Sequence, residues 1–189
     1  MEDEPLHYKR VKHFDTPAHL HFLTFSCFKR QPLLTNDLWR GWLVESIRTA
    51  CTKYTLGLWA YVFMPEHVHL LLQPLKDEYS VSEWLKSIKN SLAKRVISDL
   101  QKQQSPLLEN LKIEERPGKG SYRFWQAGPG YDKNIWSMDK AIEKARYCHR
   151  NPITRGLVRN PEDWKWSSYR WVELGARKDE PLKVDDWVG

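Results

Sequence analysis

Two histidines at the start of an apolar segment, His67 and His69, have the types and spacing of a metal site. They open residues 67–72, which read His-Val-His-Leu-Leu-Leu. A β-strand alternates its side chains between its two faces, so both imidazoles project from one face, and Val68 and Leu70 project from the other. Imidazole nitrogens bind first-row transition metals. The pattern therefore predicts a strand that holds two metal ligands rigidly, with its opposite face in a hydrophobic core.

A tyrosine and an asparagine farther along the chain, Tyr147 and Asn151, could complete this site. Residues 138–150 carry apolar side chains at helical spacing, and Tyr147 falls nearly opposite that apolar stripe. Asn151 lies four residues later, so both side chains share one face of the helix. The ordinary alternative is a tyrosine that is merely half exposed on a polar helix face.

The phenol of Tyr147 is by itself a poor nucleophile at neutral pH, because its pKa is about 10. A metal ion changes this, since it polarises the group under attack and offsets the developing charge. Two imidazoles and the amide oxygen of Asn151 would form a partial coordination shell that leaves positions for substrate oxygens and water. Such a site suits attack of Tyr147 on a phosphodiester, which gives a covalent phosphotyrosine.

The elements that must position these residues follow the order strand, helix, strand, strand, helix, strand, and then a third helix. Ser80 and Glu83 have the spacing of a helix capping box. Pro152 is expected to end the third helix, because the residue before a proline avoids helical geometry. The expected strands cover residues 19–28, 58–63, 67–73 and 122–126, and the expected helices cover residues 38–54, 81–100 and 138–150.

This order is that of the ferredoxin-like α+β fold, an antiparallel sheet with two helices on one face. If the aliphatic side chains of residues 67–73 meet those helices, His67 and His69 lie on the free face. The third helix can then cross that face with its tyrosine. Residues 101–121 show little periodicity and are expected to form an exposed connector, either disordered or a functional loop.

The bulk composition predicts one soluble domain. The 189 residues are 41% hydrophobic and 29% charged, which fits a single domain with a real core. We expect a polar N-terminal arm over residues 1–18, a catalytic domain over residues 19–171 and a C-terminal tail over residues 172–189. The sequence has no apolar run of membrane-spanning length, and its acidic first residues are not those expected of a signal peptide. Three scattered cysteines without a CxxC pair favour a cytoplasmic protein.

The charge and the aromatic content favour single-stranded nucleic acid as a partner. The net charge is +6, and ten tryptophans can offer faces on which unpaired bases stack. The candidate phosphate contacts are Lys9, Arg10 and Lys12 in the arm, and Lys86 and Lys89 on the second helix. The ordinary alternatives are a solvated arm, a solvated helix face, and tryptophans that belong to the core.

Other residues compete for the roles in this site. His19 and His21 form a second His-x-His pair, but no further ligand lies near them in the sequence. Tyr131 is a rival nucleophile, although it has no amide side chain one helical turn later. His149 is a candidate fourth ligand or proton shuttle, but two residues along a helix it faces away from Tyr147.

Several blocks of the sequence resemble the REP-associated tyrosine transposases, which are relatives of the small single-strand transposases of bacterial insertion sequences. The likeness extends over about residues 19–171. The His-x-His pair lies in the first block, at the place of the HUH motif of that family, and Tyr147 and Asn151 lie in a later one. The blocks are residues 60–72, 124–126, 146–153, 156–158 and 161–170.

The resemblance implies an HUH nuclease fold in which His67, His69 and Asn151 bind Mg²⁺ or Mn²⁺ and Tyr147 is the nucleophile. The implied reaction cleaves single-stranded DNA, joins Tyr147 to the 5′ phosphate and releases a 3′ hydroxyl. Reversal onto another 3′ hydroxyl is strand transfer. The implied substrate is a short palindromic REP hairpin with an unpaired flank, and the related proteins include monomers and homodimers.

Two other classes of function stay open from the sequence. One is a binding protein of the same fold that recognises structured DNA or RNA without cutting it. The other is a small zinc protein that uses His67, His69 and Cys148, although Cys148 lies on the apolar stripe of its helix.

Overall fold

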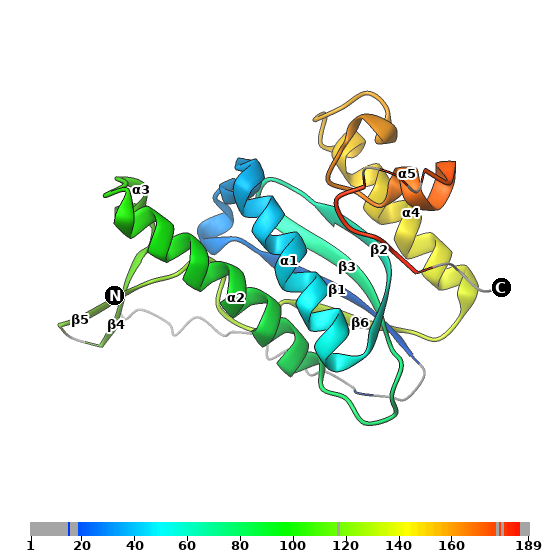
Figure 1. Ribbon diagram of the computed structural model, residues 1–189, viewed down its shortest axis with the longest axis horizontal. Helices are drawn as coiled ribbons and strands as arrows, with labels where there is room; N and C mark the ends of the chain where they lie inside the picture. Colours follow the sequence, from blue (N-terminus) through cyan, green and yellow to red (C-terminus); the bar gives the residue numbers. More distant parts are fainter. Residues whose placement is uncertain (1–14, 16–18, 117, 177, 179, 186–189) are drawn as a thin grey trace, which may run out of the picture.

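A four-stranded antiparallel sheet forms the centre of the computed structural model, which describes residues 15, 19–116, 118–176, 178 and 180–185. The strand order is β2-β3-β1-β6 (Figure 1). The basic cluster predicted at residues 9–12 lies outside the described residues. The strands are β1 (Leu20–Ser26), β2 (Leu56–Phe63), β3 (His67–Pro74) and β6 (Tyr131–Ile135).

Two long helices, α1 (Asp37–Tyr54) and α2 (Val81–Lys102), cover one face of this sheet (Figure 1). The Ser80 hydroxyl caps α2 by accepting a hydrogen bond from the Glu83 N–H at 3.4 Å, as the capping box predicts. The larger hydrophobic core lies between these helices and the sheet. Its fully buried members include Leu43, Ile47, Val68, Leu70, Leu72, Trp84 and Ile88.

A third helix, α4 (Met138–Thr154), crosses the other face of the sheet. It packs through small side chains against β2 and β3 and forms a second, smaller core. The helix contributes Ala141, Ala145 and Cys148 to this core, and the sheet contributes Val62 and Leu71 among others. The predicted α+β fold, with two helices on one face and the third helix on the other, is therefore confirmed.

The fourth strand and the end of the third helix differ from the prediction. The fourth strand is β6. Of the strand predicted at residues 122–126, Tyr122 belongs to a separate two-stranded sheet, and Trp125 forms an isolated bridge to Cys27. The helix α4 continues through Pro152 to Thr154. A proline in the last turn removes one helical hydrogen bond only, and the Asn151 carbonyl still accepts the Arg155 N–H at 3.0 Å.

The segment predicted as a connector, residues 101–121, is largely ordered. It contains the end of α2, the short helix α3 and most of a hairpin that forms its own two-stranded sheet. This hairpin lies beyond the end of α2, away from the four-stranded sheet (Figure 1). The elements are α3 (Leu107–Leu111), β4 (Lys112–Arg116) and β5 (Lys119–Tyr122).

The outer edge of β2 is covered by later parts of the chain. The Phe63 N–H donates to the Trp166 carbonyl at 2.8 Å, and the Asp185 N–H donates to the Leu58 carbonyl at 2.7 Å. Leu182 packs in the larger core. The division into arm, domain and tail stays a prediction, but the described part of the tail lies on the domain. A last helix, α5 (Tyr169–Leu174), spans the predicted boundary between domain and tail. In the described residues, no helix combines the length and the apolar character needed to cross a membrane.

Gly130 brings β6 close to β1, and its replacement is a test of this packing. A Cβ added at Gly130 would lie 2.3 Å from the Thr24 carbonyl oxygen, whereas one added at Gly128 has no atom within 4 Å. Both glycines have a positive φ. We expect Gly128→Ala to cost only backbone strain, on the order of 1 kcal/mol. Gly130→Ala should cost about 2 kcal/mol more, because β1 and β6 must separate.

Urea denaturation of the two alanine variants measures this difference in the free energy of unfolding. Equal losses in the two variants would contradict the close approach of β6 to β1.

Candidate active site

A pocket of about 550 Å³ opens between α4 and the part of the sheet that this helix leaves uncovered. The strands β1, β3 and β6 form its floor, and α4 forms one wall. All four residues predicted for the site lie in it. Its lining residues are Phe22, Thr24, Ser26, Arg30, His67, His69, Tyr131, Lys144, Tyr147, Asn151, Thr154 and Arg155.

The two imidazoles meet through their Nε2 atoms, which are 3.0 Å apart. The Nδ1 atom of His67 lies 3.1 Å from Glu66 Oε1, and the Nδ1 atom of His69 lies 2.7 Å from Thr24 Oγ1. A carboxylate only accepts hydrogen bonds, so we assign the proton of His67 to Nδ1. The same assignment at His69 lets its Nδ1–H donate to Thr24. Both Nε2 lone pairs then face the pocket.

Burial keeps both histidines neutral. It lowers the pKa of His69 to about 3, and the nearby imidazole of His67 adds to this effect. Burial also lowers the pKa of His67, although Glu66 works in the opposite direction. Metal binding requires the neutral imidazole. The site therefore offers its two nitrogen ligands without competition from protons at neutral pH.

The donor set fits a divalent metal ion. Ligand atoms lie about 2.1 Å from an octahedral ion, so two ligand atoms at a right angle to each other are about 3.0 Å apart. The two Nε2 atoms are separated by the same distance, 3.0 Å. The side-chain amide of Asn151 lies 3.2 Å from His69 Nε2. A flip of this amide presents its oxygen in place of its nitrogen. Two imidazole nitrogens and one amide oxygen can thus converge.

The zinc site that uses Cys148 does not form. Cys148 is fully buried in the core between α4 and the sheet, where burial raises the pKa of its thiol. Within residues 19–116 and the other described segments, no group of three or more His, Cys, Asp or Glu side chains is placed to hold a metal ion.

Tyr147 lies against the histidine pair of its own chain. Its ring centroid is 5.4 Å from that of His69 and 5.9 Å from that of Phe22, with both contacts edge-on. The side chain is 51% exposed. The Lys144 ammonium, one turn earlier on α4, lies 5.8 Å from the same ring centroid. The phenol is therefore both accessible from solvent and next to a cation.

Tyr131, the rival nucleophile, lines the same pocket from β6. Its ring lies edge-on to Phe22, with the centroids 6.5 Å apart. Because β1 lies between β3 and β6, the backbones at Tyr131 and His69 are two strand spacings apart, about 10 Å. This arrangement favours Tyr147 over Tyr131, since the ring of Tyr147 touches His69 directly.

The other three histidines of the described residues, His19, His21 and His149, form hydrogen bonds outside the pair. His149 is buried, and its Nε2 atom lies 2.9 Å from Ser168 Oγ, so it is no fourth ligand. His21 uses both ring nitrogens, with Asp132 at 3.0 Å and Tyr79 at 2.9 Å. The pair of His19 and His21 is thus engaged in hydrogen bonds with the protein.

The sequence did not indicate Thr24, Glu66 and Arg155 as members of the site. The Arg155 Nη1 atom donates to Glu66 Oε1 at 2.8 Å, the same oxygen that faces His67. Arg155 follows Asn151 by four residues, so helical spacing beyond Pro152 would have found it. Thr24 is opposite His69 in the register of β1 and β3, which no local pattern reveals.

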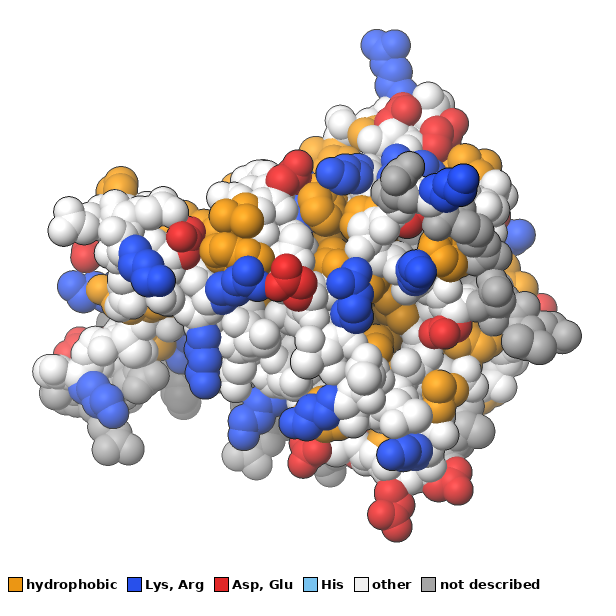
Figure 2. All heavy atoms as spheres, viewed as in Figure 1, with side chains coloured by type: hydrophobic (Ala, Val, Ile, Leu, Met, Phe, Trp, Pro, Cys, Tyr) orange, Lys and Arg blue, Asp and Glu red, His pale blue; other side chains and the backbone are white. Residues whose placement is uncertain are grey.

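The two lysines predicted on α2 lie outside the pocket. The Lys89 ammonium donates to the carbonyls of Gly128 at 2.9 Å and Gln126 at 3.4 Å, and burial lowers its pKa. Lys89 thus holds the loop before β6 against α2. Lys86 is exposed, and basic side chains lie singly over the face formed by α1 and α2 (Figure 2). A role of these lysines in DNA binding stays a prediction.

A strained turn follows β1 at the rim of the pocket. Lys29 and Arg30 have φ values of 53° and 52°, a region that costs a non-glycine residue on the order of 1 kcal/mol. Hydrogen bonds hold this turn in place. The Arg30 N–H donates to the Cys27 carbonyl at 3.0 Å, and the Lys29 N–H donates to Gln126 Oε1 at 3.2 Å.

Comparison with known proteins finds similarity to transposases. The family model of the IS200-like transposases matches residues 16–111. A Haemophilus influenzae protein assigned as a REP-associated tyrosine transposase is 23% identical over 147 residues, which are 77% of this chain and 74% of that protein.

Two solved structures are similar to this chain. The structure of a REP-associated tyrosine transposase bound to a REP hairpin superposes with a TM-score of 0.66 at 19% identity, over 96% of this chain and 92% of the other. A Deinococcus radiodurans protein assigned as a transposase gives a TM-score of 0.44 at 18% identity, over 78% of this chain and 95% of the other. The first likeness shows a common fold.

Proposed function

We propose that this chain, which belongs to the IS200-like transposase family, cleaves and rejoins single-stranded DNA with Tyr147 as its nucleophile and a divalent metal ion as its cofactor. One observation carries the proposal. The exposed phenol of Tyr147 lies against His69 in a pocket where two neutral imidazoles and an amide converge. A nucleophile, a ligand set and room for a phosphodiester thus occupy one place.

His67, His69 and Asn151 are the residues that would hold Mg²⁺ or Mn²⁺. The bound ion would polarise the phosphate and offset the charge that develops on its oxygens. Imidazole ligation suits Mn²⁺ better, whereas Mg²⁺ prefers oxygen ligands. Glu66 and Thr24 orient the rings so that both Nε2 atoms face the pocket. Such partners of a ligand histidine also raise its basicity.

The chemical step forms one bond and breaks another. The phenolic oxygen of Tyr147 attacks the phosphorus and loses its proton, while the bond from phosphorus to the 3′ oxygen breaks and that oxygen takes up a proton. The Lys144 ammonium lies 5.8 Å from the centre of the Tyr147 ring, on the helix that carries the nucleophile. The 5′ phosphate is then an ester of Tyr147, so attack by another 3′ hydroxyl reverses the step and transfers the strand.

The proposed substrate is a REP-type hairpin with an unpaired flank. The structure similar to this chain at a TM-score of 0.66 holds a REP hairpin, and this chain carries a net charge of +6. Because Tyr147 reaches the histidine pair of its own chain, one chain contains all parts of the proposed site. A monomer can therefore act, and a homodimer would contain two such sites.

A covalent-adduct assay tests this proposal. The protein is incubated with hairpin oligonucleotides that carry randomised unpaired flanks, in Mg²⁺, in Mn²⁺ or in EDTA. We expect a protein–DNA species that survives denaturing electrophoresis, that requires the metal, and that does not form with fully paired DNA. Tight hairpin binding without an adduct in either metal would refute cleavage and favour a binding protein of the same fold.

A further inference from the structure

The described residues place three cationic side chains around the pocket, namely Arg30, Lys144 and Arg155. Two of them are paired with carboxylates. Arg155 donates to Glu66 at 2.8 Å, and the Lys144 ammonium lies 3.0 Å from Glu143 Oε1. Arg30 is exposed and has no carboxylate partner in the part of the chain that the structure describes. Its guanidinium is thus the cation that a ligand in the pocket can recruit without breaking an ion pair.

The backbone at Arg30 is unfavourable for its residue type. Lys29 and Arg30 both adopt the left-handed conformation, which glycine adopts without strain. Glycine would relax this turn but would carry no side chain into the pocket. Strain of this kind persists where the surrounding structure holds it, and it is common at functional sites. A glycine at position 30 would therefore remove the backbone strain and the guanidinium together.

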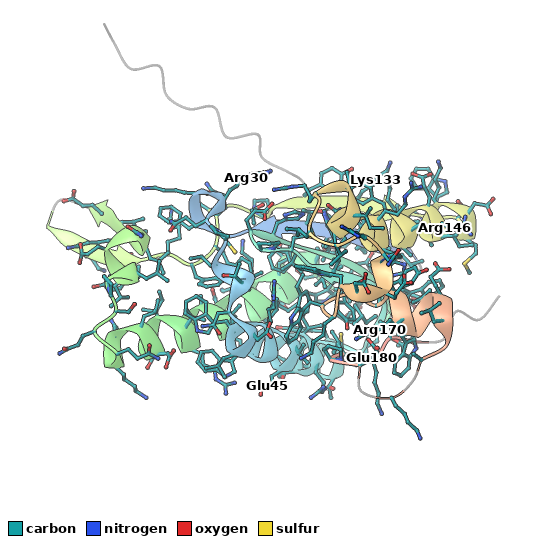
Figure 3. All side chains as sticks on the ribbon, turned by 90° about the horizontal axis from the view of Figure 1, so that it is seen from above. Arg30, Glu45, Lys133, Arg146, Arg170 and Glu180 are labelled. Atoms are coloured by element: carbon teal, nitrogen blue, oxygen red, sulfur yellow. The ribbon has the colours of Figure 1, made fainter. Side chains whose placement is uncertain are left out.

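Arg30 lies on a side of the molecule that carries other basic side chains, along which a DNA strand can run. Arg30, Lys133 and Arg146 extend along one side of the molecule, whereas Glu45, Arg170 and Glu180 lie toward the other side (Figure 3). These three cations come from the turn after β1, from β6 and from α4. A strand that crosses the pocket at Arg30 and continues along this side would meet further basic side chains.

We propose that Arg30 binds a phosphate of the DNA strand beside the scissile bond. The planar guanidinium can donate two parallel hydrogen bonds to the non-bridging oxygens of one phosphate. The assigned ligand is therefore a phosphodiester of single-stranded DNA. The inference rests on the proposed function, because it places a DNA strand in this pocket.

Salt-dependent DNA binding tests the assignment. A fluorescent hairpin oligonucleotide with an unpaired flank is titrated with each variant at several salt concentrations. We expect Arg30→Gly to weaken binding at least ten-fold. The logarithm of the association constant falls linearly with the logarithm of the salt concentration, and the slope of this line should become shallower by about 0.7. This is the change expected for one lost phosphate contact on a single strand.

Lys29→Gly is the matched control, because it relaxes the same turn and leaves the pocket unchanged. Its affinity should stay within two-fold of the wild type, with the same salt slope. Both variants should keep or raise the melting temperature, since glycine removes the left-handed strain. Arg30→Lys keeps the charge without the planar fork, so it should bind with intermediate affinity and the wild-type slope.

The outcomes separate this assignment from the proposed function. Wild-type affinity and slope in Arg30→Gly would overturn it, and so would equal losses in the two glycine variants, because the turn itself would then be the cause. If the Arg30 effect is present but the wild-type protein forms no adduct, the phosphate contact stands and cleavage fails. Absence of DNA binding by the wild type would overturn both.

Discussion

Replacing Tyr147 with phenylalanine is expected to abolish the covalent adduct, with a loss of roughly 10⁴-fold or more in the rate of its formation. The variant removes only the phenolic oxygen. The ring can keep its contacts with Phe22 and His69, so DNA affinity should stay within about two-fold of the wild type and the melting temperature should not change. Denaturing electrophoresis measures the adduct, and fluorescence anisotropy measures the binding.

Tyr131→Phe is the matched control for this experiment. It removes the hydroxyl of the other tyrosine in the pocket, and its ring can keep the contact with Phe22. We expect the wild-type amount of adduct. An adduct that persists in Tyr147→Phe and disappears in Tyr131→Phe would exchange the roles of the two tyrosines.

The second large effect is expected for His69→Ala. This variant removes one of the two proposed nitrogen ligands, so the affinity for Mn²⁺ should fall by more than about 100-fold, beyond the loss typical for an outer-shell partner. The adduct should fall with it. Thr24→Val keeps the side-chain shape but removes the hydroxyl beside His69 Nδ1. It should cost about 10- to 100-fold in Mn²⁺ affinity.

Titration calorimetry with Mn²⁺ measures these affinities, and His19→Ala serves as the control. His19 lies near Asn134 and outside the pocket, so its removal should leave the affinity unchanged. If His69→Ala binds Mn²⁺ as tightly as the wild type, the histidine pair is not the metal site.

The two halves of the site could be predicted because each depends on local geometry. Alternation along a strand puts His67 and His69 on one face, and helical spacing puts Tyr147 beside Asn151. The structure places all four in one pocket. The partners of these residues could not be predicted, because Thr24 reaches His69 only through the pairing of β1 with β3.

The errors in the fold have physical causes as well. The strand β6 is an edge strand with a single buried residue, Ile135, so it lacks the apolar alternation by which strands are found. The sequence predicts too early an end for α4, because the bias against helix before a proline is outweighed where Pro152 is buried in the fold. For the same reason the sequence does not indicate Arg155.

The unequal covering of the two sheet faces has a consequence for motion. The strand β3, which carries the histidine pair, and its neighbour β1 pack against α1 and α2 through the larger core, whereas α4 is attached through Ala141, Ala145 and Cys148. Small side chains bring the helix close to the sheet, and the core under α4 has fewer buried side chains than the core under α1 and α2. Local opening of α4 should therefore cost less free energy than opening of β1 or β3. Amide hydrogens of α4 should exchange with solvent before those of the central strands. In this architecture the group that would become joined to DNA lies on the layer that detaches most easily, and the proposed metal ligands of β3 remain on the layer that does not.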